Sequence, residues 1–339
     1  MNFNRKIMKK KNNIRILMAA LMAMAMGTSC ENGNSEFDDY DSQTVYFASQ
    51  TPVRTVQLGN DPADWDVTDD NNHCVRIKAT MGGSYGNKKD IVIDYVVDES
   101  LCENLYFSEN GNPTVKVTPL PSDYYKLTDD KLRINEGEIL GGVKVELTDA
   151  FFNDPKSLSN NYVLPLRMTG IVQGADRILE DQDYVLYALK YVNPWHAHYL
   201  RHGADKVTVD GAVSEVARHN QYVEDDEEVT ITTTAYLENI LPVTYKDKEG
   251  KNYEVRLKLT FKEDGTCSVS SATDNVTASG DGKYVTLGEK ASFGGKDRDA
   301  LYLNYKVDIP ERNTAYQTVD TLVMHYRGTV QEHFTPVEK

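Results

Sequence analysis

Short alternating runs constrain this chain more than any other feature. From residue 44 onward, runs rich in Val, Ile, Thr and Tyr are broken by Gly, Asn, Asp and Pro. In Val143-Lys-Val-Glu-Leu147, apolar residues alternate with charged ones, which is the period of a strand with one buried and one solvated face. Helical periodicity is scarce, since Asp123–Thr128 and Asp149–Ser157 each suffice for a short turn only. The pattern predicts an all-β protein.

The distribution of turns predicts two β domains. Short strands follow one another closely through residues 44–192, which is typical of an Ig-like β-sandwich. Pro194 then interrupts strand continuity and marks a boundary. Residues 193–339 contain longer alternating strands, with hairpin turns predicted at Glu263-Asp-Gly265 and Ser279-Gly-Asp-Gly282. This second segment is predicted to form an antiparallel, lipocalin-like β-barrel or a second sandwich.

Composition sets limits on the partners of the protein. The chain has 339 residues, of which 40% are hydrophobic, so it can bury the cores of two domains. Its formal net charge is −15, and no basic stripe with interleaved aromatic residues is present. A polyanion would be repelled by this field, so nucleic acid is excluded as an expected partner.

The first 29 residues have the layout of an export signal. Six basic residues precede the apolar run Ile16–Met26, and small residues lead to Cys30. The apolar run is shorter than the roughly 20 residues of an ordinary membrane-spanning helix. We therefore expect residues 1–29 to be a signal peptide that is removed on export.

The junction at Cys30 resembles the lipobox of bacterial lipoproteins, in which the cysteine becomes acylated. Gly27 departs from the Leu or Val usual three residues before it. Residues 30–43 form an acidic tether, which resembles the signal that sends Bacteroides-type lipoproteins to the outer face of the outer membrane; a plain solvated linker is the alternative. The resemblance implies a protein anchored at the outer membrane by lipid alone and facing the cell exterior.

Three cysteines remain beyond the signal. Cys74, Cys102 and Cys267 show no CxxC spacing, so they indicate neither a zinc site nor a disulfide framework. A single Cys74–Cys102 disulfide is one interpretation, and three separate buried thiols is the preferred one.

Each domain also resembles a known family. The segment Asn161-Tyr-Val-Leu-Pro-Leu-Arg-Met-Thr169 and the early Val45-Tyr-Phe47 are similar to a β-sandwich domain of unknown function in Bacteroides-type surface lipoproteins, which also precedes family-18 endo-glycosidases. Trp195 to Gly203 and Asp320-Thr-Leu-Val-Met324 resemble calycin-like β-barrel domains of unknown function. The resemblance implies a non-catalytic accessory lipoprotein of a polysaccharide-utilisation system. It carries over no binding residues.

One stretch comes close to a catalytic motif. Asp61-Pro-Ala-Asp64-Trp-Asp66-Val-Thr68 fits the acidic part of the DxxDxDxE pattern of family-18 glycosidases, but Thr68 stands in place of the catalytic glutamate. That reaction needs a carboxylic acid to protonate the leaving oxygen, and a threonine hydroxyl is far too weak an acid. We therefore expect no enzyme activity and no catalytic residues.

The same stretch offers oxygen ligands for calcium. Asp64, Asp66, Asp69 and Asp70 are the candidate carboxylates, since calcium takes 6–8 oxygen ligands. The EF-hand glycine and closing glutamate are missing, so a solvated acidic loop without cofactor is the default expectation.

Aromatic residues supply candidate contacts for sugars. Trp65 lies in the acidic loop, Tyr85 in the glycine-flanked loop Met81-Gly-Gly-Ser-Tyr-Gly86, and Trp195 at the domain boundary. His196, His198 and Tyr199 follow Trp195 and complete the candidate ligand-binding set. The two histidines, two residues apart, would also begin a metal site if His202 or His219 converged on them, although no metal is expected.

The expected function is carbohydrate binding at the cell surface without catalysis. The expected ligand is a glycan or oligosaccharide, and neighbouring surface lipoproteins are further candidate partners. The alternative is a structural or adhesive surface protein that binds a protein partner.

Overall fold

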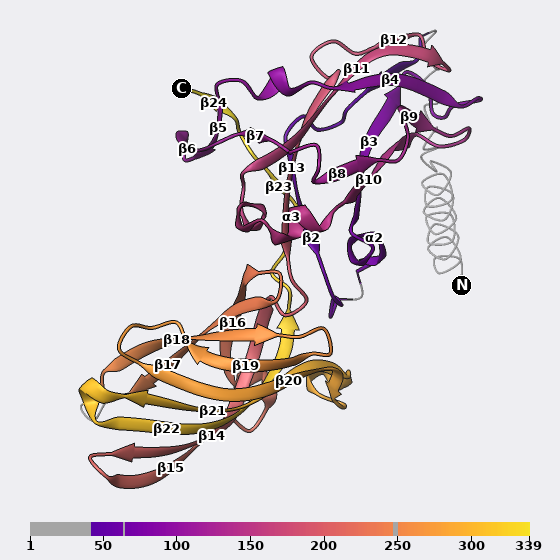
Figure 1. Ribbon diagram of the computed structural model, residues 1–339. Helices are drawn as coiled ribbons and strands as arrows, with labels where there is room; N and C mark the ends of the chain where they lie inside the picture. Colours follow the sequence, from indigo (N-terminus) through magenta and orange to yellow (C-terminus); the bar gives the residue numbers. More distant parts are fainter. Residues whose placement is uncertain (1–41, 64, 247–249) are drawn as a thin grey trace, which may run out of the picture. The chain divides into compact units, whose positions relative to one another are not determined.

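The structure is a computed structural model that describes residues 42–63, 65–246 and 250–339, which belong to one compact unit (Figure 1). The predicted signal peptide, Cys30 and nearly all of the acidic tether lie outside the described residues, as does Asp64. Among helices of the described residues, none has the length and apolar character needed to cross a membrane.

Most strands of the first domain join one large sheet. Its order is β12-β1-β3-β10-β9-β4-β11-β13-β2-β23, with β7 paired to β11 and β8 to β10. The strands are β1 (Thr44–Tyr46), β2 (Pro52–Gln57), β3 (Cys74–Gly82), β4 (Ile91–Val97), β7 (Thr118–Pro119), β8 (Tyr125–Leu127), β9 (Lys131–Ile134), β10 (Leu140–Leu147), β11 (Tyr162–Gln173), β12 (Arg177–Ile178), β13 (Tyr184–Val192) and β23 (Glu332–His333). A smaller sheet, β24-β5-β6, contains β5 (Leu105–Glu109), β6 (Asn112–Lys116) and β24 (Val337–Glu338).

The sheet encloses its apolar face in a sandwich-like arrangement. Residues that alternate along the strands, such as Val143, Val145 and Leu147 of β10, are buried in one core cluster. Phe151 and Phe152 close that cluster from the short helix between β10 and β11. The binary pattern read from the sequence is therefore the pattern of burial, because the buried and solvated faces of a strand alternate with period two.

The second domain is a closed antiparallel barrel. Its sheet follows the order β15-β14-β16-β17-β18-β19-β20-β21-β22, and β14 also pairs with β22 to close the ring (Figure 1). The strands are β14 (Ala197–Val209), β15 (Ala212–Arg218), β16 (Glu227–Ala235), β17 (Glu238–Lys246), β18 (Asn252–Phe261), β19 (Thr266–Ser271), β20 (Thr277–Glu289), β21 (Arg298–Ile309) and β22 (Thr314–Tyr326).

Helices are short throughout the described residues. The α-helices are α2 (Thr68–Asn71) and α3 (Asp149–Asn153), and the 3₁₀ turns are η1 (Glu99–Cys102), η2 (Pro155–Leu158), η3 (Val223–Asp225), η4 (Phe293–Gly295) and η5 (Pro310–Arg312). The all-β prediction, with a sandwich followed by a barrel, is confirmed. Of the two predicted helical turns, Asp149–Ser157 contains α3 and part of η2, whereas Asp123–Thr128 contains β8.

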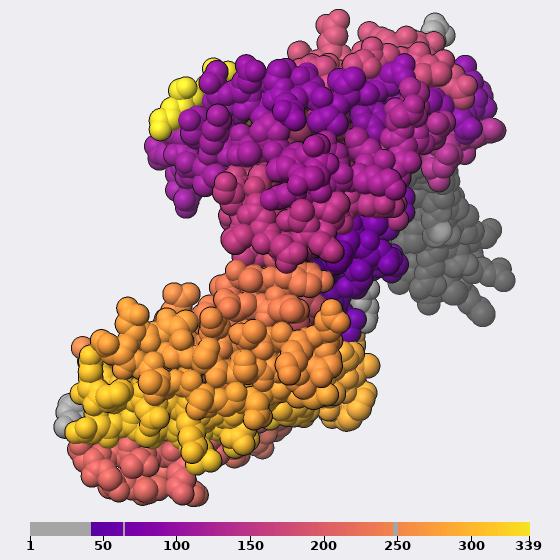
Figure 2. Space-filling model, viewed as in Figure 1, coloured from indigo at the N-terminus to yellow at the C-terminus, as the bar shows by residue number. Residues whose placement is uncertain are grey.

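The chain end leaves the barrel after β22. Strand β23 pairs with β2, and β24 pairs with β5 of the first domain. In Figure 2, the yellow C-terminal residues lie against the purple segment that holds β5 and β6. The predicted barrel range, 193–339, therefore ends with a segment that the structure places in the sandwich sheets.

The three cysteines of the described residues are free and buried, which confirms the preferred interpretation over a Cys74–Cys102 disulfide.

One hairpin turn in the barrel was not predicted from the sequence. The alternating run 206–213 reads as a single strand but contains a hairpin turn, in which Asp210 and Gly211 take positive φ angles of 46° and 85° between β14 and β15. Asp-Gly is a strong signal for this turn.

Candidate functional site

A groove crosses the outer face of the barrel over β18, β19, β20, β21 and β22. It has a volume of about 800 Å³, within the range of small-molecule sites. These strands belong to the orange-to-yellow barrel surface of Figure 2. The outward-facing lining residues are Thr260, Lys262, Thr266, Ser268, Asp281, Lys283, Tyr302, Asn304, Val319 and Thr321. Inward-facing residues between them, such as Phe261 and Leu303, also line the groove. We call this feature the barrel groove.

Strand register brings these side chains into two cross-strand rows. One row runs across neighbouring strands through Ser268, Asp281, Asn304 and Val319, and the other through Thr266, Lys283, Tyr302 and Thr321. Directly opposed residues in an antiparallel sheet have Cβ atoms about 4.5–5.5 Å apart. The two rows therefore form one continuous surface that carries hydroxyl, carboxylate, amide and ammonium groups around a single aromatic ring.

Two glycines allow β20 to lie close to β21 beneath this surface. A Cβ atom on Gly280 would lie 2.3 Å from Asn304 O, and one on Gly282 would lie 2.4 Å from Leu303 Cδ2 and 2.6 Å from Tyr302 O. The turn predicted at Ser279-Gly-Asp-Gly282 is therefore wrong, because these residues lie within β20. Neither glycine has a positive φ; both serve close backbone approach.

Tyr302 is the outward-facing aromatic residue of the barrel groove. It is half-buried, and its hydroxyl donates to Glu289 Oε1 at 2.8 Å. Burial, and after it the Glu289 carboxylate, raises the pKa of Tyr302 to about 12. The phenol therefore stays protonated at neutral pH, and its hydrogen bond holds the ring in place.

The barrel interior holds an apolar core that contains buried ion pairs. Arg201 is buried and donates through Nε to Asp320 Oδ2 at 2.9 Å and through Nη2 to the Tyr305 hydroxyl at 3.2 Å. Arg218 donates to Asp205 Oδ2 at 2.6 Å. These ion pairs lie within an apolar core. The arrangement supports binding at the outer face of the barrel rather than inside it.

The candidate ligand-binding residues at the domain boundary do not share one surface. Trp195 is 5% exposed and stacks on Phe261 at a centroid distance of 3.9 Å, so it fills the barrel core and is not a sugar platform. Tyr199 is fully buried and donates to Trp195 O at 3.0 Å. His196 Nδ1 accepts from the Thr233 N–H at 3.1 Å. The prediction of one ligand-binding set at these positions is wrong, because neighbouring positions of a strand face opposite sides.

His198 faces outward and meets other titratable groups. Its ring stacks on Tyr326 at 4.2 Å, and its Nδ1 lies 3.4 Å from Glu228 Oε1. His325 Nδ1 lies 3.0 Å from Glu228 Oε2. The suggested third metal ligands do not join them, since His202 pairs with Asp226 and His219 contacts Asn220 O. Within the described ranges, no group of three His, Cys, Asp or Glu residues is arranged to hold a metal ion.

Trp65 and Tyr85 lie in loops at opposite ends of β3. They are 76% and 73% exposed. One precedes and the other follows the nine residues of that strand, which span about 30 Å at roughly 3.3 Å per residue. Each is accessible, but the two do not form a common platform.

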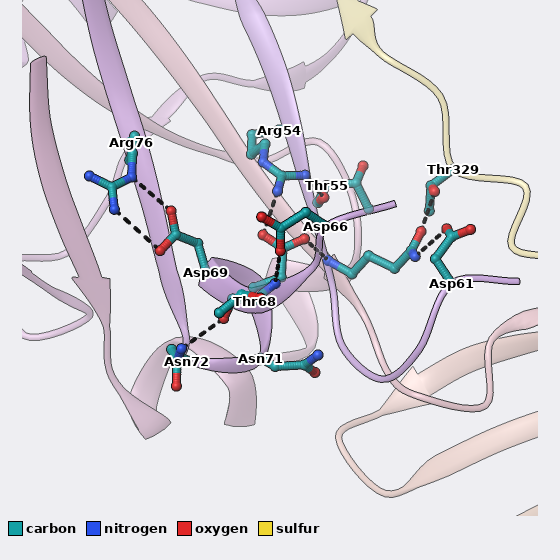
Figure 3. A network of polar contacts seen from close by, with 12 residues as sticks. Arg54, Thr55, Asp61, Asp66, Thr68, Asp69, Asn71, Asn72, Arg76 and Thr329 are labelled. Atoms are coloured by element: carbon teal, nitrogen blue, oxygen red, sulfur yellow. Dashed lines mark hydrogen bonds and ion pairs between the residues drawn. The ribbon is translucent and has the colours of Figure 1, made fainter. Parts of the chain in front are cut away.

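The carboxylates proposed for calcium are held by protein groups instead. Figure 3 shows Asp69 turned toward Arg76, with Asp69 Oδ2 and Arg76 Nε 2.8 Å apart. Asp70 is buried, pairs with Arg54 and accepts from the Gln57 N–H at 2.8 Å. Asp66 accepts from the Thr68 N–H at 3.0 Å. The three described carboxylates have separate partners, so they do not converge on one ion.

Sequence reasoning missed the barrel groove. Tyr302 and Asn304 stand in an ordinary alternating strand, so nothing local distinguishes them from other solvated positions. The available signal was the pair Gly280 and Gly282 inside a strand pattern, which indicates close backbone approach as well as a turn.

The fold defines a two-domain, all-β protein with a sandwich followed by a barrel. Residues 40–174 match the model of an N-terminal domain family, and residues 194–328 match a domain of unknown function, DUF5627. The crystal structure of a protein of unknown function from Bacteroides ovatus, at 2.40 Å resolution, is 45% identical; the match covers 89% of this chain and 100% of that chain, with a TM-score of 0.81. The chain belongs to the same family as that protein.

Two further Bacteroides ovatus structures are more distant. A multidomain protein including DUF1735 is 12% identical over 83% of this chain and 94% of that chain, with a TM-score of 0.39. A candidate carbohydrate binding protein is 10% identical over 87% and 97%, with a TM-score of 0.28. No curated protein matches the sequence.

Proposed function

We propose that the protein binds a glycan in the barrel groove and catalyses no reaction. The supporting observation is the groove itself: about 800 Å³ of space bounded by hydrogen-bonding side chains around Tyr302. Sugars offer hydroxyl groups for such side chains and C–H faces for an aromatic ring. Asp281 supplies an acceptor, Lys283 a donor and Asn304 both.

The groove is tested by titrating the purified protein with a panel of oligosaccharides by calorimetry. Tyr302→Ala is expected to weaken binding of a recognised oligosaccharide at least tenfold, and Asp281→Asn to weaken it less. Tyr222→Ala removes an exposed tyrosine outside the groove and should leave affinity unchanged. Circular dichroism checks that each variant is folded. Absence of saturable binding across the panel, or equal affinity for the Tyr302→Ala variant, would overturn the proposal.

One observation favours a second function, adhesion to a protein partner. Strand β15 pairs with β14 on one side only, and its Val213 and Val216 are 57% and 45% exposed. Exposed apolar residues on an unpaired strand edge favour contact with another chain. If crosslinking on intact cells captures a surface protein that is lost with Val213→Lys but kept with Tyr302→Ala, adhesion is the better description.

We further propose that the protein is exported and anchored at the outer membrane by a lipid on Cys30, facing the cell exterior. Support comes from the sequence of residues 1–43 alone. Cys30→Ala is expected to move the protein from the membrane fraction to the soluble fraction. An unchanged membrane fraction would contradict the lipid anchor while leaving the barrel groove unaffected.

A further inference from the structure

A second hollow lies on the outer face of the sandwich, over β3, β9 and β10. Its volume is about 330 Å³. The lining residues are Arg76, Lys78, Arg133, Asn135, Glu138, Leu140, Gly141, Gly142 and Val143. Three of its side chains are cationic, in a chain whose formal net charge is −15. We call it the sandwich hollow.

Register explains why a hollow exists at this position. Gly142 of β10 is paired with Lys78 on one side and with Arg133 on the other. A Cβ atom on Gly142 would lie 2.0 Å from Ile77 O, and one on Gly141 would lie 2.0 Å from Arg133 O. Only glycine fits this backbone, so no side chain separates the two cations.

Both arginines of the sandwich hollow have N–H donors that are not used in hydrogen bonds to the described residues. Arg76 engages Asp69 through Nε at 2.8 Å and Nη2 at 3.5 Å, and Arg133 engages Asp129 through Nε at 2.6 Å and Nη2 at 3.5 Å. In both guanidinium groups, Nη1 makes no hydrogen bond within the described part of the chain. Fixed guanidinium groups with an open edge suit oxyanions.

Two lysines add charge that no carboxylate balances. Lys78 and Lys144, which lies opposite Arg76 on the same face, form no ion pair with the described residues. Asp69 and Asp129 pair with the two arginines, and Glu138, which also lines the hollow, accepts from Asn135 Nδ2 at 3.2 Å. Four cationic side chains, those of Arg76, Lys78, Arg133 and Lys144, therefore face three carboxylates, and this local excess of one positive charge favours an anionic ligand.

We propose that the sandwich hollow binds the sulfate or carboxylate group of an acidic saccharide. The donors are Lys78 Nζ and the Nη1 groups of Arg76 and Arg133, and the missing side chain at Gly142 provides the space. The ligand class rests on the proposed glycan-binding function, but the site is separate from the barrel groove. The protein would thus hold acidic polysaccharides more tightly than neutral ones of the same length.

The test compares three probes by calorimetry at several salt concentrations: a sulfated heparin hexasaccharide, an oligogalacturonate and a neutral cello-oligosaccharide. Lys78→Gln is expected to weaken binding of at least one acidic probe about tenfold and to reduce its salt dependence. Lys306→Gln makes the same charge change on an exposed barrel position and should have no effect. Both substituted side chains are exposed, so folding is not at risk.

The outcomes separate the two proposals. A Lys78→Gln effect on an acidic probe that Tyr302→Ala does not share supports the sandwich hollow. A Tyr302→Ala effect with unchanged binding by Lys78→Gln overturns the sandwich hollow and leaves the barrel groove standing. Equal binding of neutral and acidic probes also overturns it. Equal or tighter binding to phosphatidylglycerol vesicles or to inorganic sulfate overturns the saccharide as the source of the anion.

Discussion

At the scale of the residue, His196 shows how burial decides the chemistry of a side chain. Its Nδ1 accepts a hydrogen bond from the Thr233 N–H, so the folded protein needs the neutral imidazole. Burial first, and then the charges of Arg327 and His198, lowers the pKa of His196 from 6.5 to about 4. This histidine therefore contributes to stability in its neutral form.

The pKa of His196 predicts a pH dependence of stability. Between about pH 6.5 and pH 4, the unfolded chain binds a proton at this position that the folded chain does not, so stability falls as the pH falls through that range. Above pH 6.5 the contribution is constant. Urea unfolding at pH 7.5 and pH 4.5 should show a smaller pH-dependent loss for His196→Asn than for the unchanged protein.

His219→Asn is the matched control, because His219 is exposed. That variant should lose as much stability on acidification as the unchanged protein. An identical pH dependence in His196→Asn and His219→Asn would contradict the role assigned to burial.

At the scale of the element, the position of β20 against β21 determines the shape of the barrel groove. Gly282 lies against the Tyr302 carbonyl and the Leu303 side chain, and Tyr302 is the outward-facing aromatic residue of the groove. The close approach of β20 to β21 thus depends on an absent side chain.

We predict that Gly282→Ala destabilises the protein by about 1–3 kcal/mol, because the added methyl group overpacks the contact with β21. Chemical denaturation measures the change in the free energy of unfolding. Gly86→Ala is the control, since no atom lies within 4 Å of its Cβ position. It should leave the protein equally stable, or more stable by up to about 1 kcal/mol. Similar effects of the two substitutions would show that β20 relaxes without cost.

At the scale of the whole molecule, the C-terminal segment connects the barrel to the sandwich. Arg327 is buried and donates to the carbonyl oxygens of Leu58, Asn60 and Asn193 at 2.8–2.9 Å. Beyond it, Phe334 is buried and lies 4.6 Å from Phe107, between ring centroids. The end of the chain thus belongs to the core of the first domain.

We predict that Phe334→Ala lowers the free energy of unfolding by about 3 kcal/mol or more, as for large-to-small changes in a core. Val330→Ala, at a position that is 66% exposed, should change it by no more than about 0.5 kcal/mol. Thermal and urea unfolding of the two variants make the comparison. Equal stability of both would mean that the final strands contribute little to the sandwich.

Much of the fold was predictable because strand alternation is local. The alternating runs 91–97, 131–134 and 184–192 form β4, β9 and β13, and each ends where a polar residue follows. The hairpin at Asp210 and Gly211 was missed although its signal is also local. The pairing of β23 with β2 was missed because the two strands lie far apart in the chain and neither is strongly patterned.

The candidate sites were less predictable, because a site depends on which side chains share a surface. Trp195 is conspicuous in the sequence, yet stacking on Phe261 removes it from the solvent. Tyr302 is inconspicuous, yet register places it between Lys283 and Thr321.

The sequence by itself determined the all-β class and the division into two β domains, because period-two burial and turn signals are properties of short segments. The structure decided between a barrel and a second sandwich for the second domain, and between free thiols and a Cys74–Cys102 disulfide. Tertiary structure decided where the grooves lie, which aromatic residues meet solvent and where the chain end packs. Those properties depend on the register of strands distant in the chain and on the backbone approach that Gly142 and Gly282 permit. The physical reason is that alternation along a strand determines which face of the sheet a residue lies on. The pairing of strands determines which residues of other strands lie beside it on that face.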